Sequence, residues 1–143
     1  MSAYLDASVL VPLFVEQAHS QIADRFLREH DDQILVGDFA AAEFASAMSR
    51  LVRMAMLDAV AASSLLADFD VWRSAMTEPV ECVSSDLRLA SLFVRRFELM
   101  LRAPDALHAA ICQRMGASLV TLDRRLADAA RELSINALVP GAS

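Results

Sequence analysis

The chain is organised around Asp105-Ala106-Leu107-His108-Ala109-Ala110 and, about one helix later, Leu119-Val120-Thr121-Leu122-Asp123. The first stretch has the pattern of an opening helical turn that carries a carboxylate, because Pro104 directly before it suits the first position of a helix. The second has the pattern of a short buried strand that ends on a carboxylate. Two more isolated acids, Asp6 and Glu43, lie in equally apolar surroundings upstream. We predict that the fold gathers these four acids.

Short apolar segments alternate with longer amphipathic ones along the whole chain, which predicts alternating strands and helices. We expect strands at residues 2–6, 34–36, 80–83 and 118–122, and an edge strand at 135–139. We expect helices at residues 9–15, 18–30, 39–54, 58–78, 87–101, 104–115 and 124–133. This pattern is typical of a three-layer α/β domain, in which a mainly parallel sheet of four to five strands has helices on both faces. The length and the lack of a linker or repeat predict one domain, residues 1–143.

The composition limits the class of protein. Hydrophobic residues make up 56% of the chain, which is high and suggests that a partner or a second copy covers some apolar surface. The longest apolar run, Val9 to Val15, is far shorter than the ~20 residues of a membrane span. Asp6 interrupts the N-terminal apolar stretch, so no secretory signal is visible. We therefore expect a cytoplasmic protein.

The net charge of −6 is unlike that of a typical nucleic-acid binder. Four carboxylates bound to a metal would account for most of this excess. Every basic residue is Arg, and Arg favours planar, bidentate contact with phosphate. Five arginines are candidates for contacting phosphates, with solvated helix faces as the alternative: Arg95, Arg96, Arg102, Arg124 and Arg125.

The four acids are expected at one edge of the sheet. Asp6 ends the first predicted strand and Asp123 ends the fourth. Asp105 opens a helix, and Glu43 lies about one turn into the helix after the second strand. In parallel sheets, ligands bind beyond the carboxyl ends of the strands, where helix N-termini also point. Residues far apart in the sequence are therefore expected to converge there.

Each acid also has an ordinary structural explanation. Asp6 and Asp123 suit helix N-caps, and Asp105 suits a first helical turn, where it complements the helix dipole. Glu43 fits such an explanation less well, because its neighbours are almost all Ala and Phe. A buried Glu without a partner costs several kcal/mol on the order-of-magnitude estimates for buried charges, and Arg50, two turns away, is a candidate partner.

Taken together, the acids indicate a divalent cation. Carboxylates in contact repel one another, and a cation removes that conflict. A set of oxygen ligands without His or Cys suits Mg²⁺, with Mn²⁺ as a substitute, rather than zinc. Such ions activate water and position a phosphodiester. Ser8 and Thr121, each two residues from an acid, are candidate supporting hydroxyls, and a helix N-cap is the alternative role for Ser8. His108 is expected to be a packed helix residue rather than a catalytic base.

Asp6 after the first strand, Glu43 in an Ala-rich helix and the segments 102–110 and 119–127 appear in an order and at a spacing that resemble the PIN-domain nucleases. More narrowly, the chain resembles the VapC-type toxins of bacterial toxin–antitoxin pairs, over nearly its whole length. The resemblance implies that the four acids are the catalytic residues and metal ligands, with Thr121 as the supporting hydroxyl. It further implies Mg²⁺-dependent endoribonuclease activity on RNA, inhibition by a cognate antitoxin, and a homodimer.

Three other interpretations stay open to different degrees. A PIN nuclease could serve RNA processing without an antitoxin, and an α/β interaction module could use the acids only as caps. A receiver-type or dehalogenase-type phosphotransfer domain is disfavoured, since both normally use a basic group, usually Lys, which this chain lacks. The dehalogenase motif also requires a second Asp at the position of Ser8.

Overall fold

The computed structural model describes residues 1–142 and is built on a five-stranded sheet in which every strand pairing is parallel. The strands follow the order β3-β2-β1-β4-β5 across the sheet. This confirms the predicted α/β class with a parallel sheet. The strands are β1 (Ala3–Leu5), β2 (Ile34–Gly37), β3 (Glu78–Val80), β4 (Ser118–Val120) and β5 (Ala137–Leu138).

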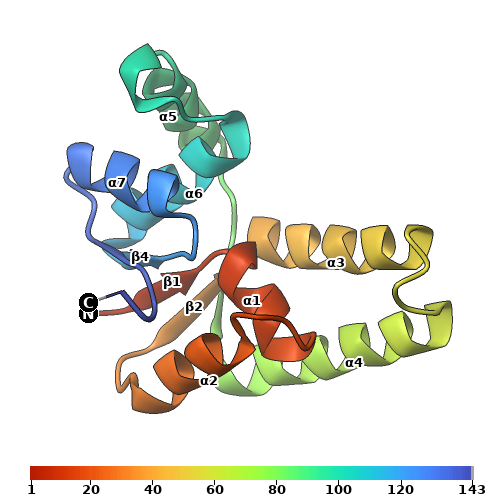
Figure 1. The fold of residues 1–143 in the computed structure, drawn as a ribbon. Helices are drawn as coiled ribbons and strands as arrows, with labels where there is room; N and C mark the ends of the chain where they lie inside the picture. Colours follow the sequence, from red (N-terminus) through yellow and green to blue (C-terminus); the bar gives the residue numbers. More distant parts are fainter. Residues whose placement is uncertain (143) are drawn as a thin grey trace.

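Helices cover both faces of the sheet, as Figure 1 shows, with α5, α6 and α7 on one side and α1 to α4 on the other. None of the helices within residues 1–142 is long and apolar enough to cross a membrane. The helices are α1 (Ala7–Phe14), α2 (Ser20–Glu29), α3 (Asp38–Arg53), α4 (Ala59–Met76), α5 (Ser84–Val94), α6 (Ala103–Met115) and α7 (Arg124–Glu132), with a 3₁₀ turn, η1 (Phe97–Leu99), between α5 and α6.

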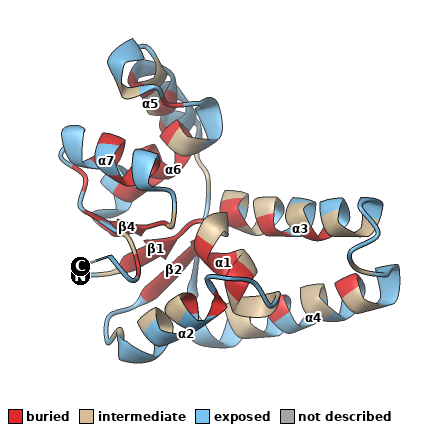
Figure 2. Ribbon diagram, viewed as in Figure 1, coloured by how far each residue is buried: buried red, intermediate tan, exposed pale blue. Residues whose placement is uncertain are grey.

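The core has two halves because successive side chains of a strand point to opposite faces of the sheet. In β1, Tyr4 packs into the cluster formed with α5, α6 and α7, whereas Ala3 and Leu5 pack into the cluster formed with α1 to α4. Figure 2 shows the strands buried between the two helical layers. Apolar side chains on both faces are what a fully covered parallel sheet requires.

Most predicted elements differ from the structure by no more than two residues at either end, but two elements differ by more. The third strand was expected at residues 80–83 but lies at Glu78–Val80, because Pro79 is tolerated in β3, an edge strand. The following helix was expected at residues 87–101 but spans Ser84–Val94. It begins early because the Asp86 carboxylate accepts a hydrogen bond from the Val83 amide. It is separated from α6 by η1 and by Met100, whose φ of 55° is left-handed.

Candidate active site

The strand order creates a natural site between β1 and β4. The chain runs outward from β1 through β2 to β3 on one side and through β4 to β5 on the other, so β1 and β4 flank the point where the order reverses. Ligands of open α/β sheets bind at such a point, beyond the carboxyl ends of the strands. Asp6 directly follows β1 and caps α1, and Asp123 follows β4 and caps α7. Glu43 projects from α3, after β2, and Asp105 lies in the first turn of α6.

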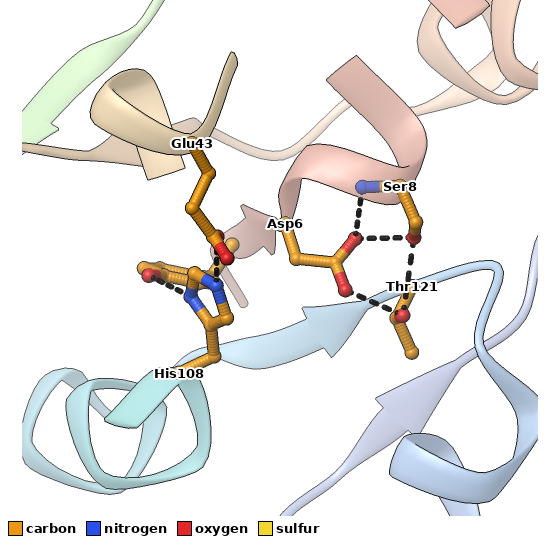
Figure 3. A network of polar contacts seen from close by, with 6 residues as sticks. Asp6, Ser8, Glu43, His108 and Thr121 are labelled. Carbon is orange, nitrogen blue, oxygen red and sulfur yellow. Dashed lines mark hydrogen bonds and ion pairs between the residues drawn. The ribbon is translucent and has the colours of Figure 1, made fainter. Parts of the chain in front are cut away.

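Asp6 is held by a network of neutral donors (Figure 3). Its Oδ1 accepts hydrogen bonds from the backbone amide of Ser8 at 3.1 Å and from the Ser8 hydroxyl at 2.5 Å. Its Oδ2 accepts a hydrogen bond from the Thr121 hydroxyl at 2.6 Å. The two hydroxyls lie 3.2 Å apart, and Ser8 Oγ also accepts a hydrogen bond from the Leu122 amide. Both predicted supporting hydroxyls therefore contact the first acid.

The environment of Asp6 disfavours its negative charge. The side chain is only 5% exposed, and this burial raises the carboxyl pKa above its usual value. The hydrogen bonds from Ser8 and Thr121 and the nearby His108 act in the opposite direction, while Glu43 adds to the increase. Since the three donors that bond Asp6 are all neutral, a cation placed against this carboxylate would relieve the cost of burying it.

Glu43 has a partner that the sequence did not reveal. Its Oε1 lies 2.5 Å from Nε2 of His108, and Nδ1 of His108 lies 2.7 Å from the Tyr4 hydroxyl. The expectation that His108 is packed in its helix is confirmed, since it is 3% exposed. The suggestion that Arg50 pairs with Glu43 is wrong: the contact comes from α6, 65 residues away in sequence. The Glu43 side chain is also not fully buried but 30% exposed.

Asp105 and Asp123 are helix-terminal acids on the more open side of the site. Asp123 Oδ1 accepts hydrogen bonds from the amides of Arg125 at 3.0 Å and Leu126 at 3.3 Å, so it caps α7 as one interpretation expected. Asp105 Oδ2 makes a long contact of 3.4 Å with the Arg102 amide. Both acids line one pocket of about 300 Å³, together with Arg102 and Arg125. This pocket therefore combines carboxylates with basic groups.

Thr121 connects the two parts of the site, because its hydroxyl donates to Asp6 and accepts from the Asp123 amide. The acids nevertheless stand in two groups, Asp6 near Glu43 and Asp105 near Asp123. Among residues 1–142, no three His, Cys, Asp or Glu side chains stand close enough together to hold one metal ion. Four-acid coordination stays a prediction. The donor chemistry fits Mg²⁺, since the acids supply only oxygen and the buried one, Asp6, accepts hydrogen bonds only from neutral groups.

The arginines predicted to contact RNA fall in different places. Arg102 and Arg125 line the pocket that holds Asp105 and Asp123. Arg96 forms an ion pair with Glu98 at 3.2 Å. Arg124, the first residue of α7, is exposed. Arg95 borders a larger pocket of about 520 Å³ without a carboxylate, whose other lining residues are Phe39, Leu87, Ala90, Ser91, Val94, Ala103, Pro104 and Leu107.

The family model for the PIN domain matches residues 3–132, so the chain belongs to the PIN domain family. No curated protein sequence matches it. Among solved structures, FitAB bound to a DNA fragment matches with a TM-score of 0.77 and 14% identity, covering 99% of this chain and 96% of that chain. VapBC2 from Rickettsia felis, bound to a fragment of its promoter, matches with a TM-score of 0.72 and 15% identity, covering 97% and 98%. VapC20 from Mycobacterium tuberculosis, a toxin that cleaves the sarcin–ricin loop, matches with a TM-score of 0.71 and 18% identity, covering 89% and 94%. The shared fold extends over almost the whole chain.

Proposed function

We propose that this PIN domain is a Mg²⁺-dependent endoribonuclease and acts as the toxin of a toxin–antitoxin pair. The observation that carries the proposal concerns the Asp6 carboxylate. It is buried beside the point where the strand order reverses, and it accepts hydrogen bonds only from neutral donors. A carboxylate that serves only as a helix cap does not need such burial. The membership of the PIN family and the toxin structures with the same fold support the same conclusion.

In this proposal Asp6, Glu43, Asp105 and Asp123 are the catalytic residues and hold the Mg²⁺, with Mn²⁺ as a substitute. A divalent ion held there would supply the chemistry of water activation and charge stabilisation at the phosphodiester. Ser8 and Thr121 orient the Asp6 carboxylate through the hydrogen bonds to its two oxygens. Thr121 links Asp6 to the backbone of Asp123, because its hydroxyl donates to the Asp6 carboxylate and accepts from the Asp123 amide.

Arg102 and Arg125 are the best placed of the predicted phosphate contacts, because they share a pocket with two of the acids. A guanidinium beside the metal ligands would form bidentate hydrogen bonds with an RNA phosphate and position the scissile bond next to the acids. Arg95, Arg96 and Arg124 lie outside this pocket and would contact RNA only beyond the site of cleavage. VapC20, which has the same fold, cleaves an RNA loop, and this supports RNA as the substrate class.

The proposed partners are a cognate antitoxin and a second copy of the chain. FitAB and VapBC2, which share the fold, were solved as complexes bound to DNA, and this supports an antitoxin partner. The hydrophobic fraction of 56% is consistent with surface that a partner covers. Co-expression with the product of the adjacent gene, followed by size-exclusion chromatography with light scattering, tests both partners. A nuclease of RNA processing would be active without forming such a complex.

The activity is tested by incubating the purified protein with total cellular RNA in Mg²⁺, in Mn²⁺ and in EDTA, and by mapping the new RNA ends. We expect cleavage at defined positions with either metal and none in EDTA. Cleavage that persists in EDTA would contradict the metal mechanism. If no RNA is cut and metal leaves the melting temperature unchanged, the chain is a non-catalytic α/β interaction module whose acids are caps.

A further inference from the structure

Three polar side chains form a chain of contacts that runs from the centre of the sheet to Glu43. Tyr4 comes from β1, His108 from α6 and Glu43 from α3. The Tyr4 hydroxyl lies 2.7 Å from His108 Nδ1, and His108 Nε2 lies 2.5 Å from Glu43 Oε1. Tyr4 is fully buried and His108 almost so, whereas Glu43 keeps one side toward solvent. The imidazole therefore uses both of its nitrogens within the protein.

The direction of these hydrogen bonds follows from the chemistry of the groups. The Glu43 carboxylate can only accept a hydrogen bond, so Nε2 of His108 carries a hydrogen and donates it to Glu43 Oε1. In a neutral imidazole with its hydrogen on Nε2, Nδ1 is an acceptor, and the Tyr4 hydroxyl can donate to it. Tyr4 and Glu43 thus favour the same tautomer of His108.

The packing around His108 fixes the direction in which the ring points. The imidazole packs against two aromatic rings, with centroids 5.6 Å away for Tyr4 and 5.3 Å away for Phe39. The position of the Tyr4 hydroxyl depends in turn on Gly37, where a Cβ atom would lie 2.9 Å from the hydroxyl oxygen. The φ of Gly37 is −70°, so an Ala is compatible with the backbone and would disturb mainly Tyr4.

Glu43 needs such a support because its side chain is long and has solvent on one side. Without a contact, a Glu side chain samples many rotamers, and ordering it costs conformational entropy. Figure 3 shows Glu43 reaching from α3 onto His108, while Ser8 and Thr121 hold Asp6 on the other side of the site. The two carboxylates are therefore held by separate networks of hydrogen bonds.

We propose that Tyr4 and His108 are positioning residues that hold the Glu43 carboxylate in the orientation needed to bind the divalent cation. This inference rests on the proposed function, in which Glu43 is a metal ligand. His108 does not touch the RNA or the reacting atoms; it acts through Glu43. Loss of a group that orients a metal ligand typically lowers metal affinity by about 10–100-fold.

The test compares four variants by the Mg²⁺ concentration that gives half-maximal RNA cleavage. His108→Leu removes the donor, and we expect it to raise this concentration by roughly 10–100-fold. His108→Gln places an amide N–H close to the position of Nε2, and we expect it to restore most of the affinity. Tyr4→Phe removes only the hydroxyl and is expected to lie between them. His19→Gln, at an exposed histidine whose side chain makes no capping bond, is the matched control and keeps the wild-type value.

Two further measurements separate positioning from stability and from activity. Thermal melting of each variant gives its folded fraction, and a loss of stability alone would lower the amount of cleavage without changing the Mg²⁺ midpoint. Calorimetric titration with Mn²⁺ reports metal affinity without RNA. In the metal-free protein, ¹⁵N spectra of the imidazoles should show His108 as the Nε2–H tautomer, and Tyr4→Phe or Gly37→Ala should convert it to a mixture.

The outcomes distinguish this inference from the proposed function. If the wild type cuts RNA but His108→Leu keeps the wild-type Mg²⁺ midpoint and Mn²⁺ affinity, the positioning role is refuted while the nuclease remains. A second outcome is that the wild type binds Mn²⁺ but cuts no RNA, while His108→Leu binds Mn²⁺ more weakly and His108→Gln binds it almost as well as the wild type. The positioning role is then supported and the nuclease proposal fails. Equal Mn²⁺ affinity in all variants refutes the positioning role in either case.

Discussion

Two aspartates of this molecule are almost equally buried but have opposite environments. Asp6, after β1, is 5% exposed, and Asp86, in the first turn of α5, is 2% exposed. The guanidinium of Arg114 in α6 binds both oxygens of Asp86, at 2.8 and 3.0 Å, and the Val83 amide donates a third hydrogen bond. Asp6 also accepts three hydrogen bonds, but all of them come from neutral groups of Ser8 and Thr121.

The difference shows in the acidity of the two carboxyls. Burial alone would raise the pKa of Asp86, but the hydrogen bonds and charge of Arg114, with the Val83 amide, outweigh it and the pKa is lowered. For Asp6, burial outweighs its hydrogen bonds and the pKa is raised. Asp86 therefore has its cation built into the fold and joins α5 to α6. The surroundings of Asp6 contain only neutral donors and are those of a carboxylate that binds a cation from solution.

The largest expected difference between the two aspartates is in RNA cleavage. Asp6→Asn should lower the rate by more than about 100-fold, since loss of a group that only supports a metal ligand already costs 10–100-fold. Asp105→Asn should have a similar effect. Asp86→Asn should leave the rate per folded molecule unchanged, because Asp86 lies outside the site. Cleavage rates with Mg²⁺, corrected for the folded fraction, measure all three.

Circular dichroism shows whether each of these variants keeps the fold. Wild-type activity in both Asp6→Asn and Asp105→Asn would remove the basis of the metal mechanism. Equal losses in Asp6→Asn and Asp86→Asn would mean that the effect comes from folding and not from the site.

The second prediction concerns the stability of the α5–α6 contact. Arg114→Leu leaves Asp86 buried without its cation and should lower the free energy of unfolding by about 3 kcal/mol. For a chain of this size the melting temperature should fall by roughly 6–12 °C. Asp6→Asn removes no cation and should show no such fall. Thermal unfolding in EDTA at neutral pH makes the comparison.

The same pair predicts opposite dependences of stability on pH. Because the folded-state pKa of Asp86 is lowered, its stabilising contribution is present above the unfolded-state pKa and is lost as the pH falls through the folded-state value. The raised pKa of Asp6 has the reverse effect: its contribution is present at low pH and is lost as the pH rises through the folded-state value. Asp86→Asn should therefore reduce the loss of unfolding free energy below about pH 4. If the variant loses as much stability as the wild type at acid pH, this account of Asp86 is contradicted.

The sequence was sufficient to predict those features that depend on local patterns. Apolar runs marked the strands, and because parallel strands present their carboxyl ends at one edge, Asp6 and Asp123 could be assigned to that edge. The start of α6 could be predicted from Pro104. The limits of β3 and α5 were predicted less well. Pro79 lies within β3, which an edge strand tolerates, and the start of α5 depends on the hydrogen bond from the Val83 amide to Asp86.

Contacts between distant parts of the chain could not be predicted in this way. His108 and Glu43 are 65 residues apart, and Asp86 and Arg114 are 28 apart. Neither pair has a periodic signal, because each joins two different helices. The useful clue to the first pair was an acid on an Ala-rich helix face, which indicated an unseen partner but did not identify it.

The fourth prediction concerns the effect of metal on stability. A ligand that binds only the folded state stabilises it by about 1.4 kcal/mol at ten times its dissociation constant. Millimolar Mg²⁺ or Mn²⁺ should therefore raise the wild-type melting temperature by roughly 3–6 °C. The increase should disappear in Asp6→Asn and persist in Asp86→Asn. A flat titration of the wild type would instead favour a role of the acids as caps only.

The smallest effect is expected for Asp6→Asn in the absence of metal. Since burial and the nearby Glu43 raise the pKa of Asp6, its charge is unfavourable in the metal-free fold. The amide removes this charge but keeps an oxygen that can accept from Ser8 or Thr121. The melting temperature in EDTA should therefore rise, by about 2 °C for a gain of somewhat under 1 kcal/mol. Asp86→Asn should lower it under the same conditions, because Arg114 then loses its counter-charge. A clear fall for Asp6→Asn would show that the hydrogen bonds stabilise the charged carboxylate more than burial destabilises it, and Asp6 would then be a satisfied structural acid like Asp86.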